Sequence, residues 1–306
     1  MRNLKIIVRL KGGMGNQLFC YAAARRLALE NNAELVIDDV TGFVRDCQHR
    51  RKYALDKFRI PARKATPLER LEPFERYRRG IAKFLARHRP FHERRYIEQE
   101  GMDFDPRLLA FRTKKRTVYL DGLWQSERYF KDVEAVIRQD FRIVPPQDPA
   151  NQEMADRIGG CNSICVHLRW YGMQNGVNGP NIKQNYYSRS IKYIMERVPS
   201  PHFFLFSNLP DASCSMLSLP EGMVTCIHHN LSDDHAYADL WLMGRCKHFI
   251  IANSTFSWWG AWLAESTPKI VIAPETKLTG LGEWNFNVLI PDEWIRIPAE
   301  IKIDSV

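Results

Sequence analysis

Three short segments of the sequence carry residue types that suit the binding of a phosphorylated ligand. They are the glycine-rich loop Gly12 to Gln17, the tripeptide His167-Leu168-Arg169, and the stretch Asn253 to Gly260. Backbone N–H groups of a glycine loop or a helix N-terminus bind phosphate oxygens, and an arginine can bind two of them at once. Each segment follows an apolar run typical of a buried strand, so we expect all three at strand ends.

Each segment also has a plainer structural interpretation. The loop is neither a dinucleotide motif, because Leu18 stands at the last glycine position, nor a Gly-Lys-Ser/Thr phosphate loop, so it can be a simple tight turn. Arg169 can pair with a surface carboxylate, and Ser254 can cap the following helix. The adjacent Asn16 and Gln17 favour ligand contact. Three tryptophans in and just after the third segment are expected in the core rather than as a sugar platform: Trp258, Trp259 and Trp262.

Strands and helices alternate along the chain and position these segments. We predict a strand over 4–10, a helix over 18–31 and a strand over 34–37, then a proline-rich linker over 141–150. A second series follows, with strands at 163–168, 202–206, 223–227, 248–252 and 269–273 and helices at 186–197, 234–245 and 255–265. Such alternation is typical of parallel sheets. We therefore predict an α/β protein with two Rossmann-like domains, 1–150 and 151–306, that face a ligand cleft.

The positive charge of the chain is concentrated in one segment. The whole chain has a net charge of +9, which favours an anionic partner. Residues 45–95 hold 17 Lys or Arg but 6 Asp or Glu, and 68–89 has apolar residues at helical spacing between arginines. This pattern predicts a cationic amphipathic helix. We expect peripheral contact with an anionic membrane; a solvated helical face is the alternative.

No metal site is expected. Asp103 and Asp105 have the Asp-x-Asp spacing of metal-dependent sugar transferases, but Pro106 follows them, which is typical of a turn.

No apolar run reaches the roughly 18 residues of a membrane span, and the seven cysteines show no disulfide pattern. We predict a cytoplasmic protein with free thiols, peripheral at most at the inner membrane face.

The motifs in this order resemble the α-1,2-fucosyltransferases of glycosyltransferase family 11, over nearly the whole chain. Residues 12–17 are similar to the family's opening motif, and residues 251–262, IANSTFSWWGAW, are similar to its most specific block. Residues 51–58 and 122–130 also match middle blocks. The resemblance implies a GT-B architecture, a GDP-fucose donor, inversion at the sugar carbon, and neither a metal nor another cofactor.

The resemblance also implies roles for individual residues. Arg169 contacts the diphosphate and acts in catalysis, and Gly15 and the catalytic Asn16 approach the donor from the first domain. The other residues that line the donor are His167, Ser254, Thr255 and Phe256.

Two departures from the family pattern bear on the donor. Trp170 and Gly172 replace an arginine and an aspartate of the family motif that begins at His167. Asn208 stands where a carboxylate is expected to recognise guanine. An amide has one acceptor oxygen where a carboxylate has two, so guanine recognition by Asn208 is weaker or shared with Asp211.

Inverting transfer needs a base for the acceptor hydroxyl. We assign this role to Asp39, after the second strand, with Asp38 and Glu275 as competitors and assistance by the leaving phosphate as a further alternative. By resemblance, the acceptor is the 2-hydroxyl of a terminal β-galactoside on a surface glycan that can be lipid-linked. The candidate acceptor contacts are Trp124, Gln125 and the loop 171–181.

Three other functions fit parts of the sequence. A related transferase with another nucleotide-sugar donor would explain Trp170 and Asn208. A non-catalytic carbohydrate-binding protein would use the tryptophans, and a nucleic-acid-binding protein would use the basic segment. The nucleic-acid function leaves the strand-end loops without a role, so we expect no nucleic-acid partner.

Overall fold

The computed structural model describes residues 4–47, 49–171, 181–217, 219–276 and 286–302. The chain divides into two compact units, Met1–Arg142 and Ile143–Val306. The boundary lies inside the proline-rich stretch that the sequence suggested as a linker. We describe each unit separately.

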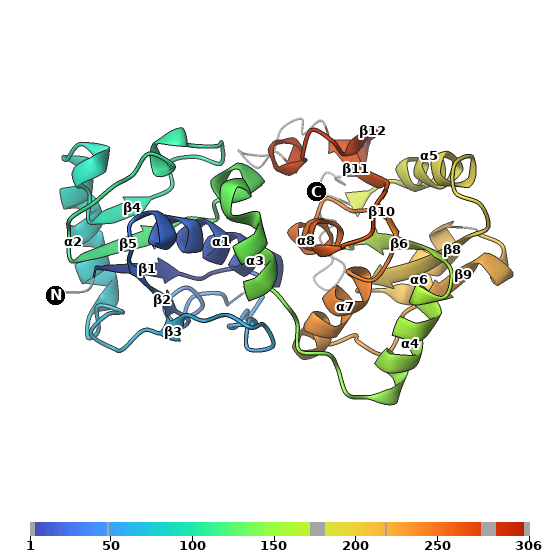
Figure 1. The fold of residues 1–306 in the computed structure, drawn as a ribbon, viewed down its shortest axis with the longest axis horizontal. Helices are drawn as coiled ribbons and strands as arrows, with labels where there is room; N and C mark the ends of the chain where they lie inside the picture. The colour runs from blue at the N-terminus through green and yellow to red at the C-terminus, as the bar shows by residue number, and fades with distance from the viewer. Residues whose placement is uncertain (1–3, 48, 172–180, 218, 277–285, 303–306) are drawn as a thin grey trace. The chain divides into compact units, whose positions relative to one another are not determined.

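The first unit is built on a five-stranded parallel sheet in the order β3-β2-β1-β5-β4 (Figure 1). The central strand is an apolar run, and Ile6, Ile7 and Val8 are at most 2% exposed. Ile7 lies opposite Val36 on one side and Tyr119 on the other. The strands are β1 (Lys5–Arg9), β2 (Glu34–Asp38), β3 (Arg63–Lys64), β4 (Tyr96–Glu98) and β5 (Thr117–Asp121), and the helices are α1 (Met14–Glu30), α2 (Glu75–Arg87) and α3 (Glu134–Asp140).

Helix α1 begins four residues earlier than the sequence pattern indicated. Its N-terminal cap is Gly13, and Gly12 has a φ of +75°, a left-handed conformation that favours glycine. Gly15, Asn16 and Gln17 therefore belong to the first turn of the helix. The helix packs on β1 and β2, and most of its side chains are buried.

The second unit is built on a six-stranded parallel sheet in the order β12-β11-β10-β6-β8-β9. Its strands are β6 (Asn162–Leu168), β8 (Pro201–Ser207), β9 (Val224–Cys226), β10 (His248–Ile250), β11 (Val271–Thr276) and β12 (Ile295–Ala299). The strands β7 (Asn181–Ile182) and β13 (Ile301–Lys302) form a short antiparallel pair. The helices are α4 (Pro149–Gly159), α5 (Gln184–Met195), α6 (Pro210–Leu217), α7 (Ala236–Met243) and α8 (Thr255–Leu263).

Both sheets have a point at which the chain reverses its direction of strand addition. In the second unit the chain passes from β6 to β8 and β9 on one side, then returns to place β10 against the other side of β6. In the first unit β2 and β3 lie on one side of β1, and β5 lies on the other. Ligands of parallel α/β sheets bind at such switch points, beyond the carboxyl ends of the strands.

Some local predictions were wrong. The helix predicted over 68–89 starts only at Glu75, because the preceding residues form turns and Phe74 has a left-handed φ of 67°. Strands β4, β5 and β12 were not predicted. Cys214 and Cys226 form a disulfide between α6 and β9, so the expectation of seven free thiols is also wrong. Spatial contact of α6 with β9 brings these cysteines together, and sequence spacing does not show that contact.

The tryptophans of α8 lie in the core, as predicted. Trp258 and Trp259 are fully buried and Trp262 is 5% exposed. The indole N–H of Trp258 donates to the Leu289 carbonyl at 2.8 Å. Among the described residues, no helix has the length and apolar character needed to cross a membrane.

Candidate active site

The switch point of the second unit brings together two of the three segments that the sequence singled out. Strands β6 and β10 are paired in parallel, with Val166 opposite Ile250. His167 is therefore near the end of β6, and Arg169 follows that strand. Ser254 lies at the start of α8, four residues after β10. Chain topology thus places an arginine and a helix N-terminus at neighbouring strand ends.

Aromatic and hydrogen-bond contacts connect these two loops. The Tyr171 hydroxyl donates to the Asn253 carbonyl at 3.0 Å. The rings of His167 and Phe256 lie 5.9 Å apart between centroids, and the Arg169 guanidinium lies 5.7 Å from the centre of the Tyr171 ring. The loop after β6 and the N-terminal turn of α8 therefore form one connected group.

The N-terminus of α8 is capped by the residue that the sequence suggested. The Ser254 hydroxyl oxygen accepts from the Phe256 backbone N–H at 3.3 Å. The first four N–H groups of a helix have no partner within the helix, and the cap satisfies one of them. The plain capping role is therefore present, and it is compatible with binding of an anion by other N–H groups of the same turn.

His167 is a neutral buried residue. Burial, with a smaller contribution from the Arg169 charge, lowers the pKa of His167 to about 3. The imidazole is 4% exposed, and its Nδ1 has no hydrogen-bond partner among the residues that the structure describes. At neutral pH this side chain can form hydrogen bonds with a ligand but adds no positive charge.

This burial predicts a specific loss of acid stability. Between about pH 3 and pH 6.5 the unfolded state binds a proton at His167 that the folded state does not, so the free energy of unfolding falls as the pH falls. We expect His167→Gln to abolish this contribution, which is about 1.4 kcal/mol between pH 7.5 and 5.5. Denaturant unfolding at both pH values measures it. Equal losses in wild type and variant would contradict the neutral buried state.

Asn208 holds the backbone of Trp170. Its side-chain oxygen accepts from the Trp170 N–H at 2.9 Å, and its amide donates to the Trp170 carbonyl at 3.0 Å. The Trp170 indole in turn donates to Ser213 at 2.8 Å. Asn208 is exposed, and one of its N–H groups and one lone pair of its oxygen remain to bind a nucleobase. The two departures from the family pattern thus contact each other, which the sequence did not indicate.

The switch point of the first unit is bridged by two of the predicted site residues. The Gln125 side chain, which follows β5, donates to the Asn16 side-chain oxygen at 2.8 Å. Gln17 is fully buried and bonds to the backbone of Gly12, Lys52 and Ala54. Asn16 is thus the amide of the glycine motif that bonds to Gln125 after β5, and Gln17 connects the motif to the backbone of residues 52 and 54.

Trp124 does not fit its predicted role as an acceptor contact. Its ring is fully buried and packs edge-on against Tyr129 at 5.5 Å. A side chain that exposes no surface cannot contact a sugar. The predicted role of Trp124 as an acceptor contact is therefore wrong, and Trp124 is a core residue. The β5 strand end directs Gln125, not Trp124, toward Asn16.

The two candidate bases at the end of β2, Asp38 and Asp39, differ in their surroundings. Asp38 accepts from the Thr41 N–H at 2.9 Å and from the Thr41 hydroxyl at 2.5 Å, which makes it a turn-forming residue. One oxygen of Asp39 lies 3.3 Å from the Lys64 ammonium. The other oxygen is buried and has no hydrogen-bond partner within the described part of the chain. Asp39 is therefore the better candidate of the two.

Sequence reasoning missed a charged cluster at the ends of β1 and β5. Asp121 is 1% exposed and lies within 3.4 Å of cationic nitrogens of Arg9, Lys11 and Lys83. Burial alone would raise the pKa of Asp121, but these cations and the Tyr96 hydroxyl hold it well below its usual range. A carboxylate with so low a pKa is a counter-ion and not a base.

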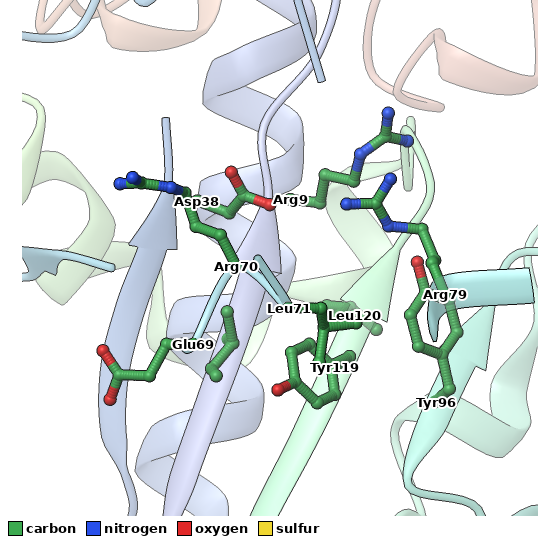
Figure 2. A pocket seen from close by; sticks show the side chains of 10 residues that line it. Arg9, Asp38, Glu69, Arg70, Leu71, Arg79, Tyr96, Tyr119 and Leu120 are labelled. Carbon is green, nitrogen blue, oxygen red and sulfur yellow. The ribbon is translucent and has the colours of Figure 1, made fainter. Parts of the chain in front are cut away.

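A small hollow lies beside this cluster (Figure 2). Arg9 and Arg79 both donate to the Thr41 hydroxyl, at 3.2 and 2.7 Å, and Figure 2 shows both side chains at the hollow with Tyr96 and Tyr119. Arg79 comes from α2, outside every motif, and only the packing of α2 on β4 brings it here. Arg79, one of the arginines of the basic segment 45–95, therefore lies at the end of the first sheet.

Two further sequence expectations concern other parts of the chain. Asp105 was expected in a turn; it caps the 3-10 helix Pro106–Leu108, where it accepts from the Arg107 N–H at 2.9 Å. Across the described residues, no group of three or more His, Cys, Asp or Glu side chains could hold a metal ion. Gly172 and most of the loop 171–181 lie outside the described residues; Tyr171 and Asn181 are hydrogen-bonded to each other.

The two units, each a parallel α/β sheet with polar groups at its switch point, have the fold class of the GT-B glycosyltransferases. The fold resembles that of an Arabidopsis thaliana FUT1 mutant in complex with GDP, with a TM-score of 0.53 and 11% identity over 88% of this chain and 70% of that one. The chain belongs to glycosyl transferase family 11, whose family model matches residues 76–287. The predicted fold class and family are both confirmed.

Two curated relatives from Escherichia coli are similar over almost their whole length. The first, an alpha-1,2-colitosyltransferase, is 31% identical over 95% of this chain and 98% of its own. The second, the O-antigen biosynthesis glycosyltransferase WbnK, is 25% identical over 94% of this chain and 99% of its own.

Proposed function

We propose that the protein transfers L-fucose from GDP-fucose to the 2-hydroxyl of a terminal β-galactoside, with inversion and without a metal ion. The observation that carries the proposal is the second unit's switch point, where Arg169, neutral His167 and the N-terminus of α8 meet. These groups suit a diphosphate, whose charge an arginine and helix N–H groups can neutralise. Membership of family 11 supports a sugar donor on that diphosphate.

We assign stabilisation of the leaving group to residues of the second unit and activation of the acceptor to residues of the first. When the bond from the sugar carbon to the diphosphate oxygen breaks, negative charge accumulates on the leaving group, and Arg169 with the α8 N-terminus stabilises it. Asp39 removes the proton of the acceptor hydroxyl as that oxygen bonds to the sugar carbon. Asn16, held by Gln125, offers a hydrogen bond to the sugar at the first unit's strand end.

A second donor is favoured by one specific observation. The relative that is 31% identical is named as an alpha-1,2-colitosyltransferase. Colitose is the 3-deoxy counterpart of L-fucose, so a site for one sugar can make most of the same contacts with the other. Trp170 and Asn208, which bond to each other in this chain, are assigned to the nucleobase, which GDP-fucose and GDP-colitose share.

We propose an acceptor that is an oligosaccharide of a growing surface polysaccharide, carried on a lipid. Similarity to an O-antigen biosynthesis glycosyltransferase supports this class of acceptor. Gln125 is 3% exposed and bonds to Asn16, so we assign it the role of holding Asn16 rather than that of a direct acceptor contact.

The donor test compares binding and transfer in one panel. We expect GDP to raise the melting temperature of the protein by several degrees, and UDP, ADP and CDP to have little effect. We then expect GDP-fucose to give α-1,2-fucosylated product with a β-galactoside acceptor in the presence of a chelator. Transfer from GDP-colitose alone would favour the second donor. Stabilisation by UDP and not GDP would contradict both.

A further inference from the structure

The helix α2 has an inverted distribution of polar and apolar side chains. A helix at a protein surface normally buries its apolar face. On the inner face of α2, Lys83 instead bonds to Glu98 at 2.5 Å and approaches Asp121 at 3.2 Å, and Arg79 bonds to Thr41. Ala86 is the helix's one buried residue among those described. Polar contacts, not apolar burial, therefore hold this helix to the sheet.

The outer face of α2 presents large apolar side chains to solvent. Tyr77 is 73% exposed, Phe84 63%, Leu85 54% and Ile81 44%. Their spacing places them on one side of the helix, as a continuous stripe. Phe74, which precedes the helix, is 74% exposed and lies at the end of this stripe. We call these five residues the apolar stripe of α2.

Arginines flank the apolar stripe. Arg78 lies on one side of it around the helix, and Arg76 and Arg87 lie on the other. All three are exposed, and neither Arg76 nor Arg78 has a carboxylate partner in the described part of the chain. An exposed apolar face bordered by cations matches a surface that is apolar inside and anionic at its boundary, which is the interface of an anionic lipid bilayer.

We propose that the apolar stripe of α2 and its flanking arginines form a docking surface for an anionic membrane. Phe74, Tyr77, Ile81, Phe84 and Leu85 enter the boundary between headgroups and acyl chains, and the guanidinium groups contact lipid phosphates. This surface does not rest on the proposed function, because none of its residues lies at either switch point. It gives the strong basic charge of residues 45–95 a physical role.

The test measures binding of the full-length protein to vesicles by flotation. We expect it to float with phosphatidylcholine vesicles that contain 30% phosphatidylglycerol at low salt, and to stay in solution with pure phosphatidylcholine. The double variant Ile81→Ser/Phe84→Ser should lower partitioning about tenfold or more, and Arg76→Gln/Arg78→Gln/Arg87→Gln should lower it about a hundredfold. The matched apolar control is Val144→Ser/Leu231→Ser, which changes exposed residues elsewhere.

The outcomes separate this proposal from its alternatives. Because the substituted side chains are exposed, unchanged melting temperatures will show that the variants fold. Absence of flotation, equal flotation with neutral vesicles, or equal loss in the control would overturn the proposal. Light scattering measures the oligomeric state. A dimeric wild type and a monomeric Ile81→Ser/Phe84→Ser variant would instead show that the stripe is the contact between two copies of the chain. Transfer to a soluble acceptor should be the same in wild type and variants, so failure of the enzymatic proposal is a separate result.

Discussion

Replacing Arg169 by alanine is expected to lower kcat by about a hundredfold to a thousandfold, with a smaller change in KM for the donor. The reason is that the charge of the leaving diphosphate is greatest in the transition state, where loss of one positioned donor has its largest effect. Arg169 follows β6 at the switch point, beside the N-terminus of α8. Steady-state kinetics with saturating acceptor measures the effect.

Two comparisons make the Arg169 result specific. Arg169→Lys keeps the charge but loses the two-pronged geometry, so it should recover only part of the rate. Arg197→Ala is the matched control, because Arg197 is an exposed arginine of the same unit that stacks on Tyr193. Near-normal turnover of Arg169→Ala, with an unchanged melting temperature, would rule out its role at the diphosphate.

Replacing Asp39 by asparagine is expected to lower kcat by about a hundredfold to ten-thousandfold, the usual effect of losing a general base. Asparagine has nearly the same shape, so the loss reflects proton transfer rather than packing. The oxygen of Asp39 that does not face Lys64 is buried at a strand end. Steady-state kinetics with saturating donor and acceptor measures the loss.

Asp56 supplies the control for this substitution. Its carboxylate also lies 3.3 Å from the Lys64 ammonium but is 64% exposed. Asp56→Asn therefore changes the charge beside Lys64 as Asp39→Asn does, and it should leave kcat within about twofold. Substantial activity in Asp39→Asn would reject Asp39 as the base and favour proton transfer to the leaving phosphate.

Most of the fold followed from the periodicity of the sequence. The apolar runs of β1, β6 and β8 are fully buried strands, and such runs are recognisable because parallel strands are apolar on both faces. Strand β4 escaped prediction because it has only three residues, and β12 because its residues alternate between half-buried and exposed positions. The missed helix start at Glu75 depends on turns that local propensity does not reveal.

The motifs indicated which strand ends carry the site, but not which side chains meet there. The pairing of Asn16 with Gln125 joins residues 109 apart, and the mutual contacts of Asn208 and Trp170 join residues 38 apart. Trp124 was misplaced for the same reason. Its neighbour Gln125 looks equivalent in sequence and is also buried, but only the path of the chain after β5 brings the Gln125 amide to Asn16.

The sequence by itself determined the family, the alternation of strands and helices, and the concentration of positive charge in one segment, because these are properties of local order along the chain. The tertiary structure decided the environment of each charge. It surrounded Asp121 with three cations, left His167 neutral in the core, and turned the apolar residues of α2 outward. Desolvation and charge pairing depend on neighbours distant in sequence, so only the folded chain specifies them.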